Sequence, residues 1–195
     1  MRELGFFNKA LLAKQVWRLM HDTSSLFYKV FKSKYFPRCS ILEAQSNARG
    51  SYAWKRIMGA RDLIRKGAVW RVGTSLNIWI WGDQWLPMMN HHSICSLVLS
   101  NPSLSDVAHL IDNQSRTWKT GIIKDTFLSH EVEAIMGIPL STWDHNDTLV
   151  WGGTKHGVYT VRSGYHFLLN ESHQEDPRTS YTFILTQVWN NIWSL

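Results

Sequence analysis

Residues 51–72 read SYAWKRIMGARDLIRKGAVWRV, and the hydrophobic periodicity changes within this stretch. From Ser51 onward, apolar residues recur at intervals of three and four, which predicts a helix over 51–66. Gly67 is the residue type that commonly follows the C-terminus of a helix. Residues 68–72 then alternate with period two, as a strand does. A helical segment that runs directly into a strand indicates the α+β class.

The sequence on either side repeats both patterns. Helices are predicted at 7–21, capped by Asn8, and at 24–35, 106–111, 117–127, 129–137, 163–169 and 181–195. Two β-hairpins are predicted, 68–81 around a turn at 73–77 and 148–161 around a turn at 152–156. The expected fold is therefore α+β, mainly α-helical with two short β-hairpins. The expected divisions are a basic helical unit at 1–66, a Trp-rich hairpin at 67–87 and a mixed unit at 88–195.

Positive charge is concentrated at the start of the chain. The 195 residues carry a net charge of +6, but residues 1–71 hold 15 Lys and Arg against 4 Asp and Glu. Such a surface suits the phosphate backbone of RNA or DNA. The other interpretation, a solvated helix surface, stays open. The candidate nucleic-acid-binding residues are Lys14, Arg18, Lys29, Lys32, Lys34, Arg56, Arg61, Arg65 and Lys66.

The 11 Trp residues allow two interpretations. They either form small aromatic cores or present a surface on which nucleobases stack. No stretch approaches the roughly 18 apolar residues of a membrane span, so no membrane partner is expected. Two Cys without a framework spacing fit a reducing, intracellular location.

Polar residues that could carry catalysis have simpler structural interpretations. His91, His92 and Cys95 lie close together, but a fourth zinc ligand at a suitable spacing is missing. Asp83 follows a glycine in a predicted turn, where its carboxylate would accept backbone N–H groups. Asp147 precedes a predicted strand and is expected in a polar loop. No catalytic residue, metal site or cofactor is therefore predicted.

Several sequence words occur in a recognisable order. They are FNKALLAKQVWRLM at 7–20, KYFP at 34–37, SYAWKRI at 51–57, GAVWRVG at 67–73, IWGDQWLP at 80–87 and DTLVWGGTKHGVYTVRSGY at 147–165. In this order and spacing they resemble the region after the polymerase domain in plant LINE-type (non-LTR) retrotransposon reverse transcriptases. The last eight residues, VWNNIWSL, resemble the start of the zinc-binding segment of those proteins. The resemblance implies a truncated zinc-binding segment, a nucleic-acid partner and a plausible nuclear location.

The same resemblance implies that this chain is not an enzyme. Polymerisation in the family needs a Tyr-x-Asp-Asp motif that holds two metal ions, and this sequence contains no Asp-Asp pair. The expected function is that of a non-catalytic fragment with at most nonspecific RNA or DNA backbone binding. Two alternatives stay open. One is a protein-interaction piece that docks through Trp189 and Trp193 of an apolar C-terminal helix, and the other is a pseudogene fragment without a function.

Overall fold

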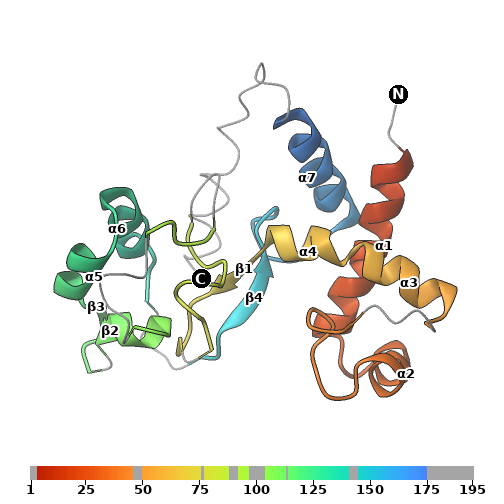
Figure 1. Cartoon of the computed structure of the whole chain (residues 1–195), viewed down its shortest axis with the longest axis horizontal. Coiled ribbons are helices and arrows are strands. Elements are labelled where there is room, and N and C mark those ends of the chain that lie inside the picture. The colour runs from red at the N-terminus through yellow and green to blue at the C-terminus, as the bar shows by residue number, and fades with distance from the viewer. Residues whose placement is uncertain are drawn as a thin grey trace. The chain divides into compact units, whose positions relative to one another are not determined.

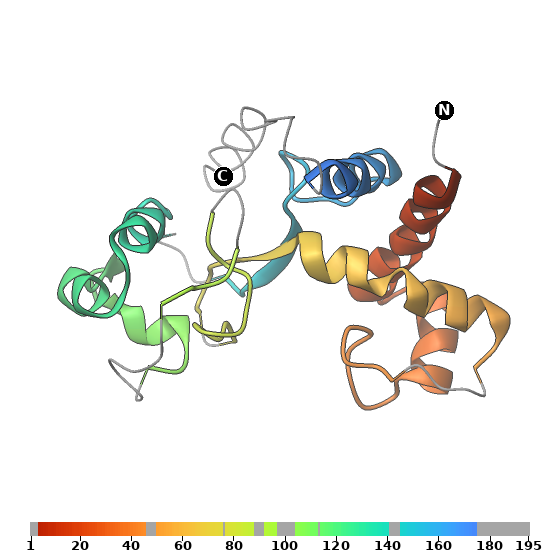
Figure 2. The same ribbon diagram turned by 45° about the horizontal axis from the view of Figure 1, so that its top comes forward.

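The structure, a computed structural model, has the predicted α+β class and is mainly helical (Figures 1 and 2). It describes residues 4–45, 50–75, 77–87, 92–96, 104–112, 114–140 and 145–174. The chain divides into two compact units. Unit 1 contains the described residues up to Gly67 and those from Val158 onward, and unit 2 contains those from Ala68 to Gly157. The predicted helix at 181–195, with Trp189 and Trp193, lies outside the described residues.

Unit 1 is helical, and two of its helices begin where the sequence predicts. It contains α1 (Leu4–His21), α2 (Leu26–Tyr35), α3 (Tyr52–Gly59), α4 (Arg61–Gly67) and α7 (Val161–Gln174). The Ser25 hydroxyl accepts the Tyr28 N–H at 3.2 Å. The Ser51 hydroxyl accepts the Trp54 N–H at 3.3 Å. Each serine thus caps a helix by satisfying an N–H that has no partner within the helix.

Three boundary predictions for these helices are wrong. The helix predicted at 163–169 is α7, which begins at Val161 and runs to Gln174, because the Thr160 hydroxyl accepts the Ser163 N–H at 3.1 Å ahead of the predicted start. Helix α1 begins at Leu4, so Asn8 lies inside the helix rather than at its cap. The segment 51–66 forms two helices instead of one, because the Ala60 N–H bonds to the Ile57 carbonyl at 3.0 Å in a tight turn. The shorter hydrogen bond closes α3 before α4 begins.

Tyr159 lies at the centre of the packing between α1 and α7. Its buried hydroxyl donates to the Ala10 carbonyl at 3.0 Å. Burial raises the pKa of this phenol. Gly164 of α7 lies against the Tyr159 ring so closely that an added Cβ would overlap the hydroxyl. A glycine is therefore required there for α7 to approach α1.

The strand pairing in unit 2 corrects both predicted hairpins. Strand β1 (Ala68–Arg71) pairs antiparallel with β4 (Thr148–Trp151), with Ala68 opposite Trp151. The segment 78–81 forms only a single bridge, between Trp79 and Asp106. After β4, the Gly157 carbonyl accepts the Trp151 N–H at 2.7 Å, but residues 157–161 form no strand. The first strand of one predicted hairpin therefore pairs with the first strand of the other predicted hairpin.

Asp147 gives the physical reason for this pairing. Its carboxylate accepts the N–H groups of Gly73 at 2.8 Å, Ser75 at 2.8 Å and Asn77 at 3.2 Å. These bonds hold Gly73, Ser75 and Asn77 against the residues that lead into β4. A Cβ on Gly73 would overlap the His145 carbonyl oxygen, so the close crossing also requires glycine.

The rest of unit 2 departs from the predicted helices in two places, at 106–111 and at the start of 117–127, where residues 117–118 form a strand and the helix begins only at Thr120. Instead of a helix at 106–111, a 3-10 helix (Val107–Leu110) leads into β2 (Ile111–Asp112), which pairs with β3 (Thr117–Trp118). The Asp112 carboxylate accepts the Gln114 N–H at 3.0 Å, which stabilises the connecting turn. Helices α5 (Thr120–Thr126) and α6 (Ser129–Met136) follow, and Gly137 ends α6 as predicted.

The described tryptophans favour the core interpretation. Trp54, Trp85 and Trp151 are fully buried, and Trp17 is 5% exposed. The Trp85 indole N–H donates to the Ile80 carbonyl at 3.1 Å, which satisfies its polar atom inside the core.

Candidate nucleic-acid interface

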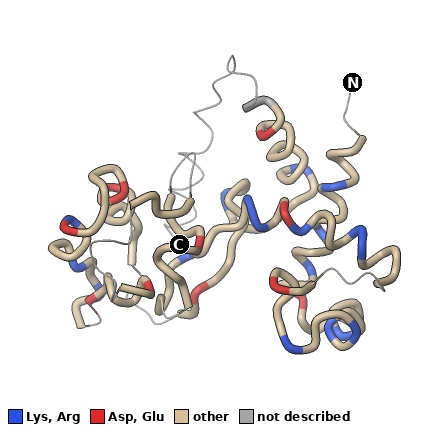
Figure 3. Tube along the Cα trace, in the orientation of Figure 1, with Lys and Arg blue, Asp and Glu red and all other residues tan. Residues whose placement is uncertain are grey.

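The nine predicted binding residues all lie on helices α1 to α4 of unit 1 (Figure 3). The described part of unit 1 holds 13 Lys and Arg against 4 Asp and Glu, whereas that of unit 2 holds 5 against 7. The structure thus gathers the positive charge into one unit. The contacts of each side chain decide which of these cations face a partner.

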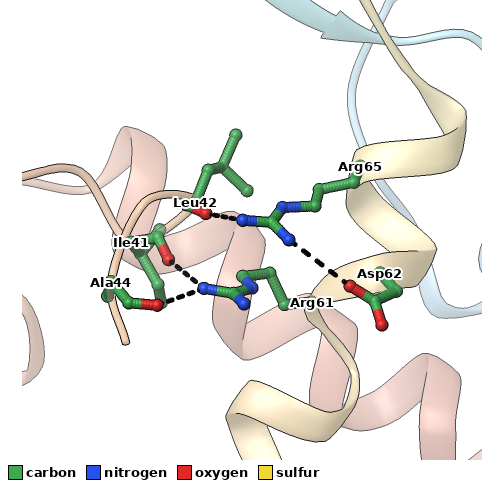
Figure 4. Close-up of polar contacts among 6 residues, drawn as sticks. All are labelled: Ile41, Leu42, Ala44, Arg61, Asp62 and Arg65. Atoms are coloured by element: carbon green, nitrogen blue, oxygen red, sulfur yellow. Dashed lines mark hydrogen bonds and ion pairs between the residues drawn. The ribbon is translucent and has the colours of Figure 1, made fainter. Parts of the chain in front are cut away.

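Two arginines of α4 stabilise the loop that follows α2 (Figure 4). The Arg61 guanidinium donates to the carbonyls of Ile41, at 3.5 Å, and Ala44. Arg65 donates to the Leu42 carbonyl and lies 3.7 Å from the Asp62 carboxylate. Burial lowers the pKa of Arg61, but an arginine stays charged at any physiological pH. Both side chains therefore donate to backbone carbonyls of the protein itself rather than to a bound nucleic acid.

Three lysines among the nine also have internal contacts. The Lys14 ammonium donates to the Tyr159 carbonyl at 2.7 Å, and Lys32 donates to the Cys39 carbonyl at 2.8 Å. Lys66 forms an ion pair with Glu171, and this hydrogen bond raises the pKa of Lys66. Together with Arg61 and Arg65, these lysines support the fold of unit 1.

Among the remaining four predicted cations, Lys29, Lys34 and Arg56 are exposed, whereas Arg18 is half-buried and donates to the Gln15 side-chain amide oxygen at 3.2 Å. The guanidinium carbon of Arg18 lies 5.3 Å from the centre of the Phe27 ring. Lys34 lies over its neighbour Tyr35, and Arg56 lies 5.8 Å from the centre of the Tyr52 ring. Contacts with aromatic faces leave the N–H groups of these cations able to bind a phosphate.

A cationic cavity of about 380 Å³ lies between α1 and α3, and we name it the α1–α3 cavity. Its lining residues come from both helices and are Gly5, Asn8, Lys9, Leu12, Lys55, Arg56, Gly59 and Ala60. Of its three cations, the candidate set contained only Arg56. A sequence signal for the other two exists, since Gly5 with Lys9 and Lys55 with Gly59 each place a glycine and a lysine on one helix face. That the two faces meet depends on the packing of α1 on α3.

The acidic side chains described in unit 1 make their contacts elsewhere. Glu43 accepts the Ser40 N–H at 2.9 Å, and Asp22 accepts the Ser24 hydroxyl at 3.2 Å. Asp62 and Glu171 pair with Arg65 and Lys66. Within this part of the chain, no carboxylate pairs with a cation of the α1–α3 cavity. Its positive charge therefore remains available to an anionic ligand.

The carboxylates of unit 2 bind the protein's own backbone. The fully buried Glu131 accepts the N–H groups of Cys95 at 2.6 Å, Ser96 at 3.0 Å and Leu128 at 3.1 Å. Burial by itself would raise the pKa of Glu131. The hydrogen bonds from the Ser96 hydroxyl and from these N–H groups outweigh that effect and lower it.

Asp83 has the turn role that the sequence predicts. Its carboxylate accepts the N–H of Trp79, four residues before it, at 2.8 Å. The Asp83 N–H in turn donates to the Trp79 carbonyl at 3.1 Å. The Trp79 ring covers Gly82 so closely that an added Cβ would overlap it. The glycine and aspartate of the IWGDQWLP segment therefore form a turn.

The His–Cys cluster is only partly described. His91 lies outside the described residues, as does Asp144. The Nδ1 atom of His92 lies 3.1 Å from the Leu86 carbonyl oxygen, and the Cys95 thiol lies 3.9 Å from the Ser93 carbonyl oxygen. Across the described ranges, no three His, Cys, Asp or Glu side chains gather as metal ligands would. Among the described helices, none combines the length and apolar character that a membrane crossing requires.

The chain is similar to two proteins of Arabidopsis thaliana. An uncharacterized mitochondrial protein is 39% identical over 85 residues, which cover 44% of this chain and 55% of that protein. A putative ribonuclease H protein is 26% identical over 201 aligned residues, which cover 93% of this chain and 30% of that protein. The chain matches no family model and no solved structure. Both similarities are consistent with a fragment derived from a plant retroelement.

Proposed function

We propose that this chain is a non-catalytic piece of a plant retroelement reverse transcriptase, and that unit 1 binds the backbone of RNA or DNA. The similarity to a putative ribonuclease H protein supports the retroelement origin, and the chain spans 30% of that protein's length. The order of the sequence words supports the finer assignment to the region after the polymerase domain of a LINE-type element. The role that we propose for unit 1 is nucleic-acid binding.

The observation that carries the binding proposal is the set of accessible cations without a carboxylate partner in the described residues. This set includes the exposed residues Lys29, Lys34, Lys55 and Arg56. Cations that contact phosphates neutralise charge and release counterions, so the binding is independent of base sequence and weakens with salt. Four such contacts with a single strand give a slope of about −3 in log K against log salt concentration.

The hydrogen bonds that carboxylates make to the protein backbone support the non-catalytic part of the proposal. Asp83, Glu131 and Asp147 each accept backbone N–H groups, so each of them stabilises a turn or loop. A catalytic carboxylate needs free oxygen atoms to hold a metal ion or a proton of the substrate.

Fluorescence anisotropy of a labelled oligonucleotide tests the binding proposal. We expect the purified full chain to bind at about 50 mM salt and to lose about two orders of magnitude in affinity by about 200 mM. Absence of binding at the lower salt concentration, or affinity that ignores salt, contradicts it. Primer extension or strand cleavage with added magnesium or manganese ions would contradict the non-catalytic assignment.

A further inference from the structure

We propose that the α1–α3 cavity holds one phosphate group of a single-stranded nucleic acid, and that Tyr52 stacks on the adjacent base. This inference rests on the proposed function and adds to it a defined site and a preference for single strands.

The charge of the cavity comes from two helices. Lys9 lies on α1, and Lys55 and Arg56 lie on α3. A tetrahedral phosphate presents oxygen atoms in several directions, so it suits cations that approach from different elements. Arg56 adds a planar guanidinium, which can donate two parallel N–H bonds to one phosphate.

The two glycines leave room for the ligand. A Cβ on Gly5 or on Gly59 would meet no atom within 4 Å, so the backbone borders open space at both positions. Neither glycine is required by the packing of unit 1, in contrast to Gly164. The volume of about 380 Å³ lies at the small end of ligand sites and suits a phosphate with its sugar.

Tyr52 supplies a stacking surface beside this charge. It is 76% exposed, and the guanidinium carbon of Arg56 lies 5.8 Å from the centre of its ring. The two residues are four apart on α3 and therefore share one helix face. A phosphate bound by Arg56 places the neighbouring nucleotide within reach of Tyr52. Only an unpaired base can offer its face to this ring, because the bases of a duplex are stacked on one another.

The decisive variants differ from each other in the charge that they place in the cavity and are matched in side-chain size. Gly59→Glu and Gly59→Gln add side chains of equal length at a position where an added Cβ meets no atom within 4 Å. We expect Gly59→Glu to weaken the binding of labelled oligothymidylate at least tenfold relative to Gly59→Gln, measured by anisotropy at about 50 mM salt. Equal affinity of the two variants overturns the phosphate site.

Tyr52 is tested with two probes. We expect Tyr52→Ala to weaken the binding of oligothymidylate about tenfold and to leave the binding of a hairpin duplex within about twofold. Tyr52→Phe keeps the ring and should retain the affinity for the single strand. An equal loss on both probes, or no loss with Tyr52→Ala, overturns the stacking role.

The outcomes also separate this inference from the proposed function. Salt-dependent binding by the wild-type chain, with Lys55→Met no weaker than Lys29→Met, refutes the cavity and leaves general backbone binding in place. A wild-type chain that binds neither probe refutes both.

Discussion

In the described residues, the charged side chains that bond to the backbone are mostly cations in unit 1 and mostly carboxylates in unit 2. In unit 1, Lys14, Lys32 and Arg61 donate to backbone carbonyls that lie outside their own helices. In unit 2, Glu131 and Asp147 accept backbone N–H groups of the loops around them. Hydrogen bonds to charged groups are stronger than those between neutral groups, so few side chains are needed in either unit.

This comparison shows why a charge count overestimates a binding surface. Of the nine cations that the sequence selects, six have internal partners in carbonyl or carboxylate oxygens, the sixth being Arg18, which donates to the Gln15 side-chain amide. Conversely, two cations of the α1–α3 cavity, Lys9 and Lys55, lie outside the selected set. The cations of unit 1 therefore divide into those that bond within the fold and those that the proposed binding would use.

The largest expected effect of breaking this pattern is at Glu131. Glu131→Gln keeps the shape of the side chain but removes the charge and turns an amide N–H₂ toward donors. We expect a loss of about 3 kcal/mol in the free energy of unfolding, because buried N–H groups lose a charged acceptor. Urea unfolding followed by tryptophan fluorescence measures it. Glu133→Gln, an exposed position on the same helix, is the control and should change stability by about 0.5 kcal/mol or less.

The pH dependence of stability should follow from the same carboxylate. Its hydrogen bonds lower the pKa of Glu131 in the folded chain below the ordinary value of 4.5. Its contribution is therefore complete above that ordinary value and is lost as the pH falls through the lower, folded pKa. We expect the urea midpoint of the wild-type chain to fall on acidification and that of Glu131→Gln to fall less steeply. Parallel curves would show that other carboxylates dominate.

A smaller effect is expected in unit 1 at Arg61. Arg61→Met keeps much of the apolar stem but leaves the carbonyls of Ile41 and Ala44 without their cationic donor. We expect a loss of about 2 kcal/mol in the free energy of unfolding. A change below about 0.5 kcal/mol would show that water replaces the guanidinium without penalty.

The smallest effect is expected at Lys32, which makes one bond to the Cys39 carbonyl. Lys32→Met should lower the free energy of unfolding by about 1 kcal/mol. Lys29→Met, at an exposed position on the same helix, should leave it within about 0.5 kcal/mol. If both variants are equally stable, the hydrogen bond from Lys32 to the Cys39 carbonyl does not contribute to the free energy of unfolding, which contradicts a stabilising role for the internal lysines of unit 1.

The sequence predicts the local elements better than their partners. Ser25 and Ser51 cap α2 and α3 as expected, and Gly137 ends α6 as expected, because capping depends on neighbouring residues alone. The strands at 68–71 and 148–151 are also recognisable from their periodicity. Their pairing with each other is not, because turn residues after each strand suggest a local hairpin and the Asp147 contacts connect residues about 70 apart.

The candidate site is likewise only partly predictable from the sequence. Helical periodicity identifies α1 and α3 as basic helices, but it does not show which cations turn toward carbonyls of a distant loop. Arg61 and Arg56 look alike in the sequence, five residues apart. The position of the 41–45 loop separates their roles, and that position follows from the packing of Ile41 and Ala44 in the core.

The most direct measurement takes Arg61→Met and Arg56→Met through both assays, urea unfolding and oligothymidylate binding, on the same protein samples. The separation of roles predicts that Arg61→Met is less stable but, while folded, binds within about twofold of wild type. It predicts that Arg56→Met keeps its unfolding midpoint and binds at least fivefold more weakly. Two variants that lose stability and affinity together, or an Arg56→Met chain that binds as wild type does, would contradict it.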